Sequence, residues 1–118
     1  MKKIFLFLIL LTGCGKPLPV FDNMDLSRWR QDRNGCQGER LAMLEPLKQQ
    51  LEKIKRLSED DVLKLLGRPD QNELWKRNQK FYHYFLEPSA KCNPANSNAR
   101  KLTIRFNATN LAKEVEIE

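Results

Sequence analysis

The sequence has little of what metal and catalytic sites are built from. Its 118 residues include one histidine, His83, and three cysteines, with no CxxC or HxxxH spacing. A zinc site needs four ligands at recognisable spacings, so no metal site is expected. No serine or cysteine lies in a recognisable nucleophile motif, and no glycine-rich loop is present to cradle a phosphate. We therefore expect no enzyme activity and no cofactor.

Charge of one sign and long apolar runs are also scarce. The chain has 21 Lys and Arg against 15 Asp and Glu, a net charge of +6 that is spread along the sequence. Such a charge does not by itself indicate nucleic-acid binding. The longest apolar run, residues 4–11, is far shorter than the roughly 20 residues that cross a bilayer. The apolar content of 41% excludes a fully disordered chain, and the length has room for one domain.

The N-terminus has the order of a secretory signal peptide. Lys2 and Lys3 form a basic head, the apolar run follows, and small residues precede Cys14. Residues 11–14 (LTGC) match the lipobox of bacterial lipoproteins at all four positions. That resemblance implies a diacylglycerol on the Cys14 thiol, cleavage before Cys14, and acylation of the new amino terminus. The alternative is an ordinary cleaved signal with an incidental cysteine.

The residues after Cys14 bear on location and on domain boundaries. Gly15 stands where an Asp would, in well-studied Gram-negative systems, suggest retention in the inner membrane, so an outer-membrane, periplasm-facing location is favoured. Two prolines and little periodicity predict a tether. We expect a signal peptide over residues 1–13, a lipidated tether over 14–27, and one domain over 28–118. Val20 and Phe21 could dock on the domain or on a partner.

Two cysteines remain after Cys14, and export would place them where disulfides persist. Cys36 and Cys92 then have only one pairing open to them. The bridge would close a loop of about 56 residues, worth about 4 kcal/mol in the chain-entropy model. Free thiols and a metal site are the alternatives.

The first half of the domain predicts helices. Between residues 38 and 57 the apolar residues are spaced by three and four, which indicates one helical stripe, and Pro46 must kink or restart that helix. Ser58 is a good N-cap for a second, short helix, which Gly67 ends and Pro69 prevents from resuming. The residues of the first stripe are Leu41, Leu44, Leu47, Leu51, Ile54 and Leu57.

The second half predicts strands. Residues 81–86 are rich in aromatics, and 102–106 and 111–117 alternate between apolar and polar residues. Residues 88–99 have the composition of a loop, and the segment around Trp75 is a polar link. The predicted fold is α+β, with two N-terminal helices packed on one face of a three-stranded antiparallel meander (αα-βββ).

This order of elements resembles the SmpA/OmlA (BamE-like) lipoproteins over residues 38–118. The family's Leu-Leu-Gly-x-Pro ending of the second helix is matched here by residues 65–69. The resemblance implies a non-enzymatic accessory subunit of the machine that inserts outer-membrane β-barrels. The same unit is similar to that of β-lactamase inhibitor proteins, which bind other proteins through one sheet face. The residues that match the family's strands are Phe81, Tyr82, Tyr84, Leu102, Ile104, Phe106 and Asn107.

One strand suggests a binding surface. Helices on one side of a three-stranded sheet leave the other side to solvent or a partner, and residues 81–86 are apolar on both faces. We expect Tyr82 and Tyr84 to be the outer, partner-binding pair, since tyrosine suits a half-wet surface. The alternative is that the tether or the 88–99 loop covers both faces. His83, between aromatics, is expected to be a packed or surface residue.

A basic segment precedes the first predicted helix. It combines Trp29 with four arginines and could contact lipid headgroups or acidic protein, or simply be a solvated surface. The arginines are Arg28, Arg30, Arg33 and Arg40.

Together these features predict a membrane-anchored bacterial lipoprotein that acts as a non-enzymatic protein-interaction module in the cell envelope, as an accessory to outer-membrane assembly. Its expected partners are the lipid bilayer, through acylated Cys14, and an envelope protein. The alternative is a small inhibitory or ligand-binding periplasmic lipoprotein domain with no assembly role.

Overall fold

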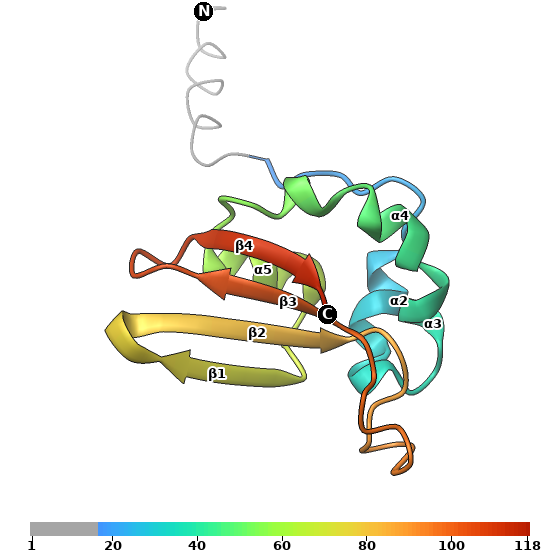
Figure 1. The fold of residues 1–118 in the computed structure, drawn as a ribbon. Coiled ribbons are helices and arrows are strands. Elements are labelled where there is room, and N and C mark those ends of the chain that lie inside the picture. Colours follow the sequence, from blue (N-terminus) through green and yellow to red (C-terminus); the bar gives the residue numbers. More distant parts are fainter. Residues whose placement is uncertain (1–16) are drawn as a thin grey trace, which may run out of the picture.

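The computed structural model describes residues 17–118, with helices in the first half and a sheet in the second (Figure 1). The α-helices are α2 (Leu26–Gln31), α3 (Glu39–Ala42), α4 (Leu44–Lys48) and α5 (Glu59–Leu66). Short 3-10 turns are η2 (Arg33–Gly35), η3 (Leu51–Lys53) and η4 (Lys76–Asn78). The strands are β1 (Gln71–Trp75), β2 (Gln79–Phe85), β3 (Lys101–Phe106) and β4 (Ala112–Ile117).

The sheet is an antiparallel meander in the order β1-β2-β3-β4. This confirms the α+β class and the predicted strands 81–86, 102–106 and 111–117, but the sheet has a fourth strand. The prediction of a polar link around Trp75 is wrong, because that segment is β1. β1 is an edge strand with every residue exposed, so no alternation of apolar residues marked it. Left-handed Arg77 and Asn78 make its turn into β2.

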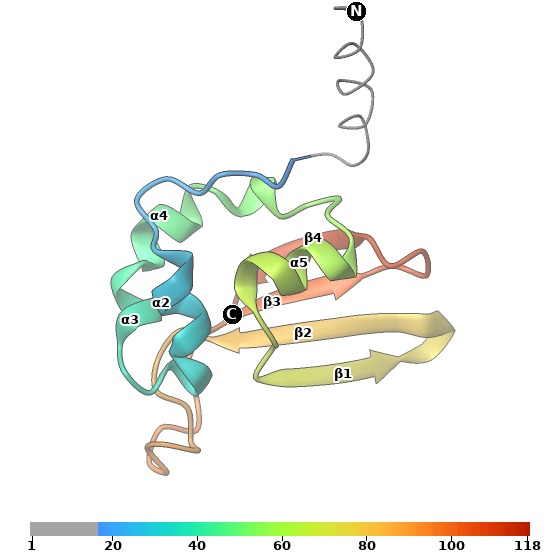
Figure 2. The ribbon, with the colours of Figure 1, turned by 180° about the vertical axis from the view of Figure 1, so that it is seen from behind.

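Among residues 17–118, one helix covers the sheet. Figure 2 shows α5 lying across one face, whereas α2, α3 and α4 stand beside the sheet at the end where β2 finishes. The prediction of two helices on one face is therefore wrong in its first helix. The opposite face of the sheet has no helix over it within residues 17–118.

The predicted helix over residues 38–57 is broken into α3, α4 and η3. Met43 and Gln50, at φ/ψ of −98°/8° and −125°/15°, interrupt the helical backbone. Pro46 falls in the first turn of α4, where its missing N–H costs no hydrogen bond. The apolar stripe still points inward, since Leu44, Leu47 and Ile54 are buried in the core.

Helix α5 has the ends that its sequence predicts. The Ser58 hydroxyl accepts a hydrogen bond from the Asp61 N–H at 3.1 Å. Gly67 ends the helix with φ at +80°, in the region that favours glycine, and a Cβ there would lie 3.1 Å from the Arg30 side chain. The hydroxyl of Tyr84 donates to the Gly67 carbonyl at 2.8 Å, which joins this helix end to β2.

The described part of the predicted tether packs on the domain. Phe21 belongs to the buried core and Leu18 packs against it, so both dock on the domain itself. The Lys53 ammonium donates to the Val20 carbonyl at 2.6 Å and lies 5.7 Å from the centre of the Phe21 ring. The domain therefore begins near residue 18 and not at residue 28. Residues 1–16, with the signal peptide and Cys14, lie outside the described part of the chain.

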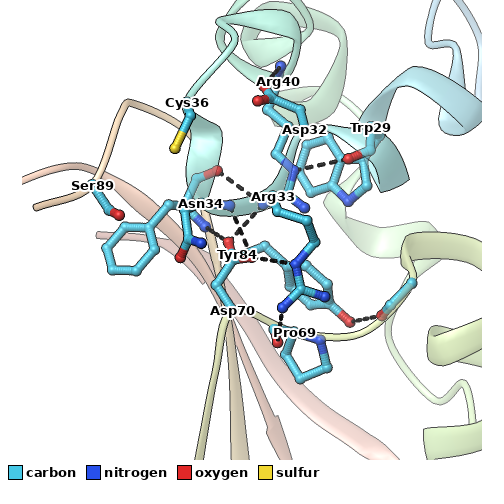
Figure 3. Close-up of polar contacts among 12 residues, drawn as sticks. Trp29, Asp32, Arg33, Asn34, Cys36, Arg40, Pro69, Asp70, Tyr84 and Ser89 are labelled. Carbon is cyan, nitrogen blue, oxygen red and sulfur yellow. Dashed lines mark hydrogen bonds and ion pairs between the residues drawn. The ribbon is translucent and has the colours of Figure 1, made fainter. Parts of the chain in front are cut away.

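A buried ion pair joins the helices to the sheet (Figure 3). The fully buried Arg40 guanidinium donates to the Asp70 carboxylate at 2.7 Å and to the Trp29 carbonyl at 3.0 Å. It also lies 4.9 Å from the centre of the Trp29 ring. The Asp70 carboxylate accepts further hydrogen bonds from the backbone N–H groups of Asn34 and Phe85, at 3.0 and 2.8 Å. Helices α2 and α3, turn η2 and the end of β2 thus meet at one ion pair, with α2 bonded to its arginine and η2 and β2 to its carboxylate.

The disulfide closes the same corner of the molecule. Cys36 and Cys92 are bonded, with 5.8 Å between their Cα atoms, which confirms the predicted pairing. The bridge ties the end of η2 to the loop between β2 and β3. Beside it, Gly35 has φ at +67°, and a Cβ there would lie 2.6 Å from the Glu87 carbonyl, so only glycine fits.

A second polar contact joins α5 to the sheet. Glu59, in the first turn of α5, accepts a hydrogen bond from the Tyr82 hydroxyl and an ion pair from Lys80 at 3.0 Å. Burial acts to raise the pKa of Glu59, but the hydrogen bonds from Tyr82 and Lys80 and the lysine charge outweigh it, so the pKa of Glu59 lies below its usual value.

We expect Asp70→Asn to lower the free energy of unfolding by about 3–5 kcal/mol, because it leaves the buried Arg40 charge without a counter-charge. Urea unfolding of the oxidised protein at pH 7 measures this. Glu45→Gln, which removes the exposed partner of Lys48, is the control and should cost no more than about 1 kcal/mol. A loss for Asp70→Asn no larger than that of the control would contradict the role of the pair.

We expect Glu59→Gln to destabilise the protein by about 1–2 kcal/mol at neutral pH. Because the folded-state pKa of Glu59 is lowered, its contribution is present above the unfolded-state pKa and is lost as pH falls through the folded-state value. The gap between wild type and variant should therefore shrink below about pH 4. Thermal unfolding at several pH values tests this, with exposed Glu52→Gln as the control. A gap independent of pH would refute it.

Candidate interaction surface

The two faces of β2 are the reverse of what the sequence suggested. Tyr82 and Tyr84 were expected to be exposed, but they lie under α5 with 3% and 0% of their surface accessible. Their hydroxyls reach Glu59 and the Gly67 carbonyl in the helical layer, so a buried tyrosine here has its polar partner. The expected partner-binding pair is therefore a core pair.

The pattern of apolar residues in β3 indicates which face of β2 is buried. In the antiparallel register Tyr82 pairs with Ile104 and Tyr84 with Leu102, so these residues share a face of the sheet. Because β3 is apolar only on that face, it identifies the buried side of β2. Burial, together with the Glu59 hydrogen bond and charge, raises the pKa of Tyr82, and burial raises that of Tyr84, so both hydroxyls stay protonated at neutral pH.

The open face of the sheet carries a row of aromatic rings. Trp75 of β1 lies 5.8 Å from Phe81 of β2, measured between ring centres, and Phe81 lies 6.3 Å from the stacked His83 ring. Phe85 continues the row along β2. Trp75 has 59% of its surface exposed, and Phe81 and Phe85 are half-buried. Aromatic rings on a surface without a helical cover are typical of protein-binding patches.

His83 lies in the middle of this row and links three strands. Its Nε2 is 2.6 Å from the Glu73 carboxylate of β1, and its Nδ1 is 2.9 Å from the Thr103 hydroxyl of β3. This order of a hydroxyl, an imidazole and a carboxylate is also that of a catalytic triad, in which the imidazole activates the hydroxyl as a nucleophile. Thr103 is buried in mid-sheet, however, and residues 17–118 form no pocket in which a substrate would meet it. The arrangement is therefore a cross-strand clasp.

Ion pairs flank the aromatic row on the β3–β4 side. Arg105 donates to the Glu114 carboxylate at 2.9 Å, and this hydrogen bond and the arginine charge lower the pKa of Glu114. The Lys101 ammonium lies 6.0 Å from the centre of the Phe85 ring. The open face thus has apolar rings along β2, bordered by the Arg105–Glu114 ion pair and by the Lys101 cation.

The free edge of the sheet adjoins the same row. β1 pairs only with β2 among the described strands, and Leu74, on its opposite face, is 73% exposed. At the other edge, Ala112 of β4 exchanges backbone hydrogen bonds of 2.8 Å with Arg56 and Leu57. β4 is thus covered at its first residue, whereas the outer backbone of β1 has no such partner among residues 17–118. We define the candidate surface as β1 together with Phe81, His83 and Phe85.

The basic segment predicted around Trp29 is divided between the core and the surface. Trp29 and Arg40 are fully buried. Arg30 donates to the Leu65 carbonyl at 3.0 Å, and Arg33 to the Arg68 carbonyl at 3.3 Å, so both hold the end of α5. These two arginines and Arg28 nevertheless remain exposed, and Arg28 lies beside Asp25 and Glu39. The interpretation as a solvated surface therefore holds for three of the four arginines, whereas Trp29 and Arg40 are core residues. Contact with lipid headgroups or acidic protein stays a prediction.

Comparisons with models of protein families, with curated proteins and with solved structures found no match. Among residues 17–118, no helix has the length and apolar character needed to cross a bilayer. The same residues contain no cluster of three or more potential metal-ligating side chains.

Proposed function

We propose that this chain is a bacterial lipoprotein, anchored to the outer membrane through acylated Cys14, whose domain is a non-enzymatic protein-interaction module. The observation that carries the interaction role is the open sheet face. Exposed Trp75 of the edge strand β1 packs there against the aromatic side chains of β2. A partner that covers these rings and pairs with β1 would bury apolar surface and satisfy the open backbone groups together.

The disulfide supports the export that this proposal requires. A bond between Cys36 and Cys92 persists in an oxidising compartment such as the periplasm, and it leaves Cys14 as the one cysteine outside the bridge. A lipobox cysteine without a disulfide partner in the domain is free for acylation. The resemblance of residues 38–118 to the SmpA/OmlA lipoproteins adds the narrower proposal of an accessory role in outer-membrane assembly.

We expect Cys14→Ser to abolish labelling by radioactive palmitate and to release the domain from the membrane fraction, because no thiol remains there to be alkylated. The double variant Cys36→Ser/Cys92→Ser is the matched control and should keep its label. Growth with the labelled fatty acid, followed by fractionation, measures both. Unchanged labelling and fractionation of Cys14→Ser would refute the anchor.

We expect a photo-crosslinking amino acid at Trp75 to trap an envelope protein in intact cells. The matched control places the same amino acid at exposed Asp60, on α5, and should give several-fold less product. Adding Phe81→Ser to the Trp75 probe should also reduce the yield, because Phe81 packs against residue 75. No product from Trp75, or equal yields from both positions, would contradict binding by the open face.

The identity of the trapped protein separates the narrower roles. A component of the β-barrel insertion machine would support the assembly role, and a deletion strain should then have reduced outer-membrane barrels. A soluble periplasmic enzyme as the trapped protein, with normal barrel levels, would favour the inhibitory alternative.

A further inference from the structure

The link between the domain and the proposed lipid anchor is short, and its domain end is fixed. This inference rests on the acylation of Cys14 proposed above. Leu18 packs against the core and Phe21 is buried in it. Only residues 15–17 separate Cys14 from Leu18. Four Cα–Cα steps span at most about 14 Å. An acylated Cys14 would therefore hold Leu18 close to the headgroup layer.

The chain leaves the domain beside α4 and η3. Lys53 of η3 bonds the Val20 carbonyl at 2.6 Å and lies 3.5 Å from the Asp22 carboxylate. The Gln50 side chain, between α4 and η3, exchanges hydrogen bonds of 2.7 and 2.8 Å with the backbone of Asp22. Figures 1 and 2 both show the N-terminal segment running along these two elements. The exit point is thus fixed by hydrogen bonds from two neighbouring residues.

We infer that the domain lies with this side against the bilayer surface, so that a lipid headgroup layer is its ligand there. We call this side the α4–η3 edge and define it by the exposed residues among 20–22 and 45–56. Its exposed cations are Lys48, Lys55 and Arg56, and its exposed carboxylates are Asp22, Glu45 and Glu52.

The chemistry of the α4–η3 edge fits a headgroup layer. Val20 is apolar and 76% exposed, so entry into the interfacial region removes its surface from water. Lys48 and Lys55 are exposed cations beside Glu45 and Glu52, at 3.3 and 3.0 Å. Arg56 adds an exposed cation with no acidic neighbour within ion-pair distance among residues 17–118. Cations of this kind are attracted to phosphate groups, and the acyl chains supply the remaining affinity.

The sheet then carries the candidate surface away from the membrane. β4 is the strand nearest the α4–η3 edge, because Arg56 donates to the Ala112 carbonyl at 2.8 Å. β1 lies three strands further on, which is about 14 Å at the usual strand spacing. Figure 1 shows β1 at the side of the sheet opposite the blue segment that begins at residue 17. Trp75 and the open edge therefore face a partner that approaches from the aqueous side.

Paramagnetic lipids test this orientation on the full chain. The acylated protein, purified from membranes, is placed in nanodiscs of phosphatidylethanolamine and phosphatidylglycerol with a small share of gadolinium-chelating headgroups. Amide relaxation enhancement is then measured by NMR. We expect it to be several-fold larger for residues 48–56 than for residues 73–77, because the effect falls steeply with distance from the headgroups.

The control lengthens the link without touching the domain. Insertion of a Gly/Ser linker between Lys16 and Pro17 should keep the protein on the discs but reduce the difference between the two segments several-fold, because a flexible linker frees the domain to rotate. If the wild-type protein co-elutes with the discs but shows equal or reversed enhancement, the orientation is overturned while the anchor stands. If the protein does not co-elute with the discs at all, the anchor and the orientation both fail.

Discussion

The architecture depends on the burial of one charged group, the Arg40 guanidinium. A buried cation is tolerated only when a counter-charge and hydrogen-bond acceptors surround it. Asp70 supplies the charge and the Trp29 carbonyl supplies a second acceptor. Because Asp70 also accepts from the backbone of Asn34 and Phe85, the ion pair fixes where α2, η2 and α3 stand against the end of β2. The disulfide and the close approach of Gly35 to Glu87 act at the same corner.

Placing the helices at the end of the sheet determines which faces are covered. α2, α3 and α4 are committed to the corner around Arg40, so α5 alone lies over the sheet. Eight residues of helix cover the apolar side of β2, β3 and β4, where Tyr82, Tyr84 and Ile104 are buried. Within the described residues no helix covers the other face. Its aromatic rings pack against one another, and the His83 side chain bonds to Glu73 and Thr103 beside them. The open face with its half-buried rings is thus a consequence of placing α2, α3 and α4 around Arg40 at the end of the sheet.

The sequence predicts the elements that local chemistry encodes. Ser58 and Gly67 mark both ends of α5, alternation marks β3 and β4, and the count of cysteines identifies the bridge. The predictions that were wrong concern features that depend on contacts between residues distant in the sequence. From the sequence, Arg40 is expected at the surface. Only the fold shows that Asp70, thirty positions away, lies beside it and allows its burial. β1 is exposed along its whole length because it is an edge strand, so its sequence has no alternating pattern. Which face of β2 is buried follows from its pairing with β3.

An open edge strand carries a risk of pairing with a second copy, and β1 has features that oppose this. In antiparallel pairing of two β1 strands centred on Glu73, the two Glu73 carboxylates would lie opposite each other, which is unfavourable. The hydrogen bond to His83 holds Glu73 in that position on the open face. Lys76 and Arg77 add exposed cations directly after the strand. A partner strand with a neutral residue opposite Glu73 avoids the carboxylate repulsion that a second copy would meet. The same edge strand is therefore better suited to a different protein than to self-association.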